Sequence, residues 1–174
     1  MQHVGLALFS FGGKDYLICV DHRSGYPLYQ LLRSTTSDSV ICTLSTWFNL
    51  LGWPSSIRSD GGPQFRSDFT NFCLKHGIRH ELYAPYNPKS NGLAKAGVKS
   101  VKNIFKKCLS SGAKADFMLC EWQNVPRSDG YSPSQRMFGR SQRTCLPSLP
   151  SQKTPINFVQ AAASKDSAHT HGQK

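Results

Sequence analysis

Residues 55–83 read SSIRSDGGPQFRSDFTNFCLKHGIRHELY. A short strand is expected from Ser55 to Ser59. A helix should follow, because Ser67 can cap it, apolar residues recur behind it at helical spacing, and Gly77 can end it. A further strand is expected over residues 78–83. Two strands that flank a helix predict a parallel pair joined by a right-handed crossover.

Three more strands are expected ahead of this unit. Val4 to Phe9 reads VGLALF, and Tyr16 to Val20 is the continuous apolar run YLICV, which is typical of a strand buried on both faces. A third strand is expected from Tyr26 to Leu32. Turns at Gly12-Gly13 and at Arg23-Ser24-Gly25 predict that these three strands form an antiparallel meander.

Helical spacing marks the remaining elements. One helix should run from capping residues at 36–38 to a stop at Gly52, and a long helix from Gly92 to about Leu109. Shorter helical segments are expected over 114–124 and 131–138. The apolar stripe of the long helix consists of Val98, Val101, Ile104, Phe105, Cys108 and Leu109. This order of elements predicts an α/β fold with a central five-stranded mixed sheet flanked by helices.

The chain has 174 residues, a length typical of one domain. The patterned elements lie within residues 3–140. Residues 141–174 are rich in Ser, Pro, Gln and Thr and show almost no periodicity, so we expect them to form a flexible polar tail.

The charge balance is strongly positive. Lys and Arg number 21 against 10 Asp and Glu, which gives a net charge of +11 and a pI near 9.6. Such an excess favours a polyanionic partner, nucleic acid before others, although a generically basic protein is the alternative. No apolar run reaches membrane-spanning length, and the first ten residues do not resemble a secretory signal.

The six cysteines do not form a C-x-x-C pair, which argues against a zinc site. Most of them lie in apolar stretches, where a buried free thiol is the simplest interpretation. They indicate a reducing, intracellular compartment.

Four segments together carry a family resemblance. They are Asp21–Pro27 (DHRSGYP), Ser59–Phe65 (SDGGPQF), Phe72–Ile78 (FCLKHGI) and Pro85–Gly92 (PYNPKSNG). In this order and spacing they resemble the integrase catalytic cores of retroviruses and gypsy-type long-terminal-repeat retrotransposons. The later segments 130–133 and 138–140 are also similar to these elements. The resemblance covers roughly residues 3–140 and implies an RNase H-like fold.

The resemblance implies polynucleotidyl transfer with two Mg²⁺ ions held by two aspartates and a glutamate. Asp60 matches the second aspartate. The first aspartate position falls on Ala7, and the glutamate position falls on Lys95. Two of the three metal ligands are therefore replaced, one of them by a cation. Because a lone carboxylate rarely fixes two Mg²⁺ ions, we expect this copy to be catalytically inactive.

Three other acidic residues are candidate substitute ligands. Asp15 is expected to be a solvated turn residue, and Asp21 ends the second strand as a turn or edge residue. Asp68 is expected in the first turn of a helix, where its charge suits the helix dipole. None of them replaces the missing ligands.

The long helix carries a basic face made of Lys95, Lys99, Lys102 and Lys106. A solvated lysine face is the plain interpretation. The resemblance favours phosphate contacts instead, because in this family the helix borders the DNA-binding cleft. The preceding loop looks like the family's active-site loop, and its candidate DNA contacts are Tyr86, Asn87, Lys89 and Asn91.

Two classes of function stay open. One is an integrase domain that joins element DNA to target DNA, inactive in this copy. The other is a non-catalytic DNA-binding or interaction remnant of a retroelement, and a nuclease of the same fold is a distant third. The resemblance further implies DNA partners (element ends and target DNA), a homo-oligomer and a nuclear location.

Overall fold

The computed structural model describes residues 1–83 and 92–144, without the side chain of Leu93. Within these residues, Met1–Arg143 form one compact unit. The expected loop over 85–91 and almost all of the expected tail over 141–174 lie outside the described residues, so the domain boundary stays a prediction.

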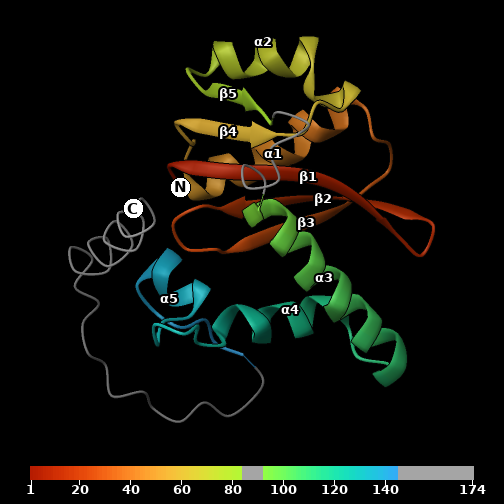
Figure 1. Ribbon diagram of the computed structural model, residues 1–174, viewed down its shortest axis with the longest axis vertical. Helices are drawn as coiled ribbons and strands as arrows, with labels where there is room; N and C mark the ends of the chain where they lie inside the picture. The colour runs from red at the N-terminus through yellow and green to blue at the C-terminus, as the bar shows by residue number, and fades with distance from the viewer. Residues whose placement is uncertain (84–91, 145–174) are drawn as a thin grey trace, which may run out of the picture. The chain divides into compact units, whose positions relative to one another are not determined.

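A five-stranded mixed sheet forms the centre of this unit, as predicted (Figure 1). Its strands are β1 (His3–Phe11), β2 (Lys14–Asp21), β3 (Pro27–Leu32), β4 (Ser56–Ser59) and β5 (Arg79–Leu82), in the spatial order β3-β2-β1-β4-β5. The first three strands pair antiparallel, β4 pairs parallel with β1, and β5 pairs parallel with β4. The meander and the crossover pair expected from the sequence are both present.

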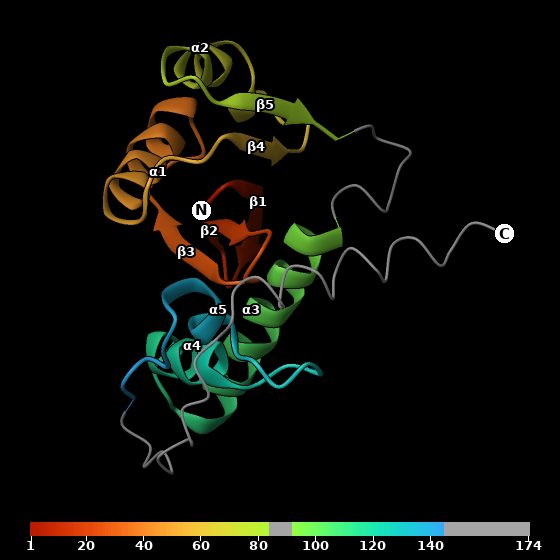
Figure 2. The same cartoon turned by 90° about the vertical axis from the view of Figure 1, so that its left-hand side faces the viewer.

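Helices cover both faces of the sheet. They are α1 (Ser37–Leu51), α2 (Ser67–Lys75), α3 (Gly92–Ser111), α4 (Ala115–Asn124) and α5 (Pro133–Phe138), with a 3₁₀ turn η1 (Pro63–Phe65) before α2. Figure 2 shows α1 and α2 on one side of the sheet and α3 on the other. No described helix is long and apolar enough to cross a membrane.

Capping explains both ends of α1, and one capping prediction, that for α2, is wrong. The Thr36 side chain accepts a hydrogen bond from the Ser39 amide, and Gly52 ends α1 with a positive φ of 92°. The N-cap of α2 is Arg66, not Ser67. Because η1 leads directly into α2, Ser67 is already inside the helix with a φ of 25°, and its hydroxyl does not cap.

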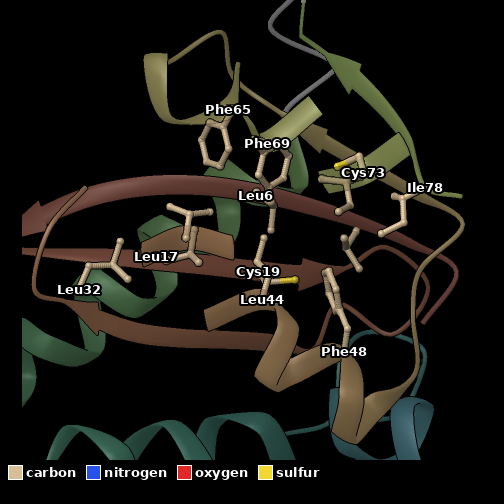
Figure 3. Close-up of a cluster of buried hydrophobic side chains, with 13 residues drawn as sticks. Leu6, Leu17, Cys19, Leu32, Leu44, Phe48, Phe65, Phe69, Cys73 and Ile78 are labelled. Carbon is tan, nitrogen blue, oxygen red and sulfur yellow. The ribbon is translucent and has the colours of Figure 1, made fainter. Parts of the chain in front are cut away.

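Each face of the sheet has its own apolar core, since successive residues of a strand point to opposite sides. Leu6, Leu17 and Cys19 pack with α1 and α2 on one face (Figure 3). Ala7, Ile18 and the α3 residues pack together on the other face. We refer to this second side as the α3 face.

Two expectations about burial need correction. Leu109 is 78% exposed, because it lies at the border of the α3 stripe, one turn beyond Phe105, near the helix end. Cys42 is exposed as well, whereas Cys19 and Cys73 are buried.

Candidate active site

Ala7 and Asp60 occupy matching positions on neighbouring strands. In the parallel β1–β4 ladder, Gly5 is the partner of Arg58. Two residues further along each strand the chain reaches Ala7 and Asp60, which directly follows β4. The Ala7 methyl group is buried on the α3 face, so a carboxylate at this position would point to the same side.

The Asp60 carboxylate is held by its own loop. Its Oδ1 accepts a hydrogen bond from the Gly62 amide at 3.1 Å, and Arg66 Nε donates to the Gly61 carbonyl at 3.0 Å. A Cβ atom on Gly62 would come within 2.3 Å of Gln64 Nε2 and 2.9 Å of Asp60 Oδ1, so a larger residue there would displace these two side chains. Among the described residues, Asp60 makes no ion pair.

The start of α3 lies against β1. A Cβ atom on Gly5 would lie 3.3 Å from the Cβ of Ala94. Lys95 is the next residue, and its side chain is exposed. The three positions that the resemblance assigns to metal ligands thus lie in β1, directly after β4 and in the first turn of α3, and their role as a set stays a prediction.

Tyr83 is a residue of this site that the sequence analysis missed. Its amide donates to the Ser59 carbonyl at 3.0 Å, which extends the β4–β5 pairing by one residue. Its hydroxyl lies 3.4 Å from the position of a Cβ on Gly5. The pKa of the Tyr83 phenol is raised, above all by burial. The charge of nearby Arg58 lowers this pKa, and the charges of Glu81 and Asp60 raise it. The sequence feature that could have pointed to Tyr83 is an aromatic residue at the end of the strand that follows Asp60.

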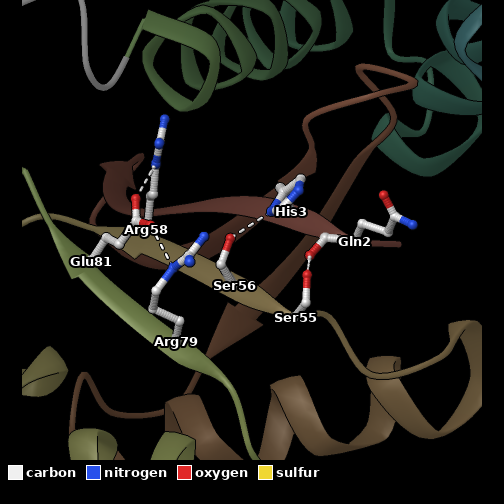
Figure 4. Close-up of polar contacts among 7 residues, drawn as sticks. All are labelled: Gln2, His3, Ser55, Ser56, Arg58, Arg79 and Glu81. Carbon is white, nitrogen blue, oxygen red and sulfur yellow. Dashed lines mark hydrogen bonds and ion pairs between the residues drawn. The ribbon is translucent and has the colours of Figure 1, made fainter. Parts of the chain in front are cut away.

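Two rows of paired residues, most of them polar, run across the strands β1, β4 and β5 on the α3 face. One row is Gly5, Arg58 and Glu81, and the other is His3, Ser56 and Arg79. Glu81 binds Arg58 Nε at 2.6 Å through one oxygen and Arg79 Nε at 2.9 Å through the other, and His3 bonds Ser56 at 2.7 Å (Figure 4). The hydrogen bond from Arg58, above all, lowers the pKa of Glu81.

The lysines of α3 have different surroundings. Lys95, Lys99 and Lys106 are exposed. Lys102 is half-buried, and its ammonium group lies 5.5 Å from the centre of the Phe9 ring, a cation–π distance. Among the described residues none of the four makes an ion pair. Tyr86, Asn87, Lys89 and Asn91 lie outside the described residues, so their predicted DNA contacts stay predictions.

The remaining acids do not complete a metal site. Asp21 is 3% exposed, and its Oδ2 accepts from both the amide and the hydroxyl of Ser24, at 2.8 and 2.6 Å. It faces Val4 in the β1–β2 ladder and stabilises the following turn, as predicted. Within residues 1–83 and 92–144, no group of three His, Cys, Asp or Glu side chains could hold a metal ion.

Relatives of this chain are retroviral and nematode proteins, while no family model matches it. The chain is 34% identical over 141 residues, 77% of its length, to the uncharacterized protein K02A2.6 of Caenorhabditis elegans. It is 36% identical over 101 residues to the Gag-Pro-Pol polyprotein of human T-cell leukemia virus 2, and 30% identical over 125 residues to the Pol polyprotein of an ovine maedi visna related virus. These matches cover 55% and 70% of the chain. The chain spans only 11%, 7% and 11% of the three relatives.

Solved structures share the fold. The catalytic core domain of BIV integrase superposes with a TM-score of 0.69 at 17% identity, covering 79% of this chain and 94% of that core. A chain of the simian T-cell lymphotropic virus intasome, solved with the PP2A regulatory subunit B56 gamma, gives 0.68 at 24% identity and covers 88% of this chain and 58% of that chain.

The sheet order, with the ends of β1 and β4 and the start of α3 gathered on one face, defines an RNase H-like domain of the integrase catalytic-core kind. The chain shares the fold of retroviral integrase catalytic cores, and its sequence relatives include retroviral Pol and Gag-Pro-Pol polyproteins.

Proposed function

We propose that this chain is a DNA-binding integrase core that neither trims nor joins DNA ends in its present sequence. The observation that carries the proposal is the donor set around Asp60. Ala7 offers a methyl group on the α3 face, and Lys95 offers an ammonium group. Residues 84–91 contain no Asp, Glu, His or Cys, so this adjoining segment adds no strong metal ligand.

These residues do not fit a pair of Mg²⁺ ions. Mg²⁺ prefers hard oxygen ligands and gives up its waters reluctantly, so one carboxylate is a weak anchor. A Lys95 ammonium near such a site would add repulsion, about 1 kcal/mol per pair of unit charges at 4 Å in water and more beside protein. The proposal therefore assigns no reaction step to a metal ion in this chain.

DNA binding is supported by charge. The net charge of +11 favours contact with phosphates, as do the α3 lysines, which make no ion pair within the part of the chain that the structure describes. One structural neighbour is a component of an intasome, which is consistent with a DNA partner and a homo-oligomer for this chain. A nuclear location is part of the proposal, and fluorescence microscopy of a tagged chain tests it.

The decisive experiment is an activity assay on labelled element-end DNA with Mg²⁺ or Mn²⁺. Under the proposal the chain gives neither trimmed nor joined products, while it still shifts the same DNA in a binding assay. Metal-dependent joining by the unmodified chain would overturn inactivity. Failure to bind DNA at low salt would overturn the proposed DNA binding. The alternative, a retroelement remnant that acts through other partners, would then be favoured.

A further inference from the structure

We propose that Arg58, Tyr83 and Lys95 form a phosphate-binding site for the DNA backbone that needs no metal ion. The inference rests on the proposed function, because it names the part of the protein that would receive a phosphate at the former catalytic centre. It concerns the α3 face where β1, β4 and β5 run side by side.

The alternation of β4 places Arg58 on this face. Ile57 is fully buried against α1 and α2. Since neighbouring strand residues point to opposite sides, Arg58 points to the α3 face beside its partner Gly5. α3 packs on β1 and β2. The side chains of Arg58 and Arg79 keep 45% and 68% of their surface exposed.

Glu81 holds the two guanidinium groups in place. Each of its oxygens binds one Nε atom, so the carboxylate has an arginine on either side (Figure 4). The terminal N–H groups of Arg58 have no hydrogen-bond partner among the described residues. A planar guanidinium with free terminal N–H groups suits a phosphate, which it can bind through two parallel hydrogen bonds.

Gly5, the partner of Arg58, lets the Tyr83 hydroxyl and the start of α3 come close. Because Gly5 has no side chain, the Tyr83 hydroxyl and Ala94 both approach its α-carbon, with Lys95 next in the chain. The phenol can donate a hydrogen bond, and the ammonium supplies charge. Where the family uses two divalent cations, this chain thus places two cationic side chains and a hydroxyl.

The charge around the site favours an anion. Three positive groups face it or flank it, namely Arg58, Arg79 and Lys95, against two negative groups, Glu81 and Asp60. His3 lies in the outer row and is bonded to Ser56. The site thus carries one more positive than negative charge. Arg58 and Arg79 share Glu81, and Lys95 makes no ion pair among the described residues.

The test is fluorescence anisotropy of a labelled DNA duplex with the full chain, in EDTA and in Mg²⁺ at equal ionic strength. We expect the same affinity in both buffers. Arg58→Gln and Lys95→Gln should each weaken binding by roughly threefold to tenfold, and each should lower the slope of log K against log salt by about 0.9. Tyr83→Phe should weaken binding by a smaller factor and leave the slope unchanged, because it removes no charge.

Matched controls separate this site from general charge. Arg33→Gln and Lys75→Gln remove the same charges from exposed positions after β3 and at the end of α2. They should leave the affinity within about twofold of the parent. Equal effects of site and control variants, or binding that requires Mg²⁺, would overturn the inference while DNA binding itself stands. A parent chain that binds no DNA would overturn both proposals.

Discussion

Gly97 of α3 lies directly against Val20 of β2: a Cβ atom at Gly97 would come within 2.6 Å of Val20 Cγ2 and 3.2 Å of Ile18 Cδ1. This close approach seats α3 on the sheet. Three residues earlier in the same helix, Ala94 lies against Gly5 of β1, so the start of α3 contacts both strands.

Gly97→Val should therefore destabilise the fold. Alanine at a helix interior gains about 1 kcal/mol over glycine, but a β-branched side chain here would overpack a stiff valine on a strand, at a cost of about 1–3 kcal/mol. We expect a net loss of about 1 kcal/mol in the free energy of unfolding, measured by urea denaturation. Gly92→Ala is the control, because a Cβ at Gly92 meets nothing within 4 Å. An equally stable Gly97→Val variant would show that α3 can shift away.

Mg²⁺ binding should return only when both of the family's missing carboxylates are restored together. Ala7→Asp alone should bind no Mg²⁺ by calorimetry, because the Lys95 ammonium still opposes a cation near Asp60. Ala7→Asp with Lys95→Glu should bind it, since three carboxylates then surround the site. Strand joining by the double variant is not required for this prediction. Mg²⁺ binding by the single variant would mean that Lys95 lies away from the metal position.

The α3 lysines should dominate the salt dependence of DNA binding. For the parent chain, affinity should fall on the order of tenfold or more between about 50 and 200 mM salt. Lys99→Glu, Lys102→Glu and Lys106→Glu together should abolish binding. Lys14→Glu, Arg33→Glu and Lys75→Glu together change the net charge equally at exposed sites outside α3 and should weaken binding far less. Equal losses in the two triple variants would identify the α3 lysines as a merely solvated face.

His80 should make stability depend on pH. Its Nε2 bonds Ser59 Oγ at 2.8 Å and its ring packs edge-on against Phe69, and burial lowers its pKa from 6.5. A lowered histidine pKa means that the folded state prefers the neutral ring. Its contribution is complete above pH 6.5 and is lost as the pH falls towards the folded pKa.

The measurement is the urea midpoint between about pH 5 and pH 8 for the parent chain and for His80→Gln. The parent should lose stability as the pH falls below 6.5, and the variant should lose less over the same interval. A parallel decline in both proteins would assign the pH dependence to other groups.

Much of the architecture followed from local patterns. The strands around Val4–Phe9 and Tyr16–Val20 and the helix ended by Gly52 lie close to their predicted bounds. Turn glycines, capping side chains and apolar periodicity act over a few residues, so a sequence expresses them directly. The position of Asp60 at the end of a strand is of this kind. The N-cap of α2 was misplaced because the 3₁₀ turn before it left no separate local signal.

The sequence by itself determined that Ala7 and Lys95 offer no metal-binding side chain at the positions that the resemblance assigns to ligands, because residue identity is a local fact. Only the tertiary structure decided what surrounds them. The row of Gly5, Arg58 and Glu81, and the reach of Tyr83 towards Gly5, join segments that are tens of residues apart. Strand order and register set these contacts, and both depend on how the whole sheet packs against α1, α2 and α3 and not on any short stretch of chain.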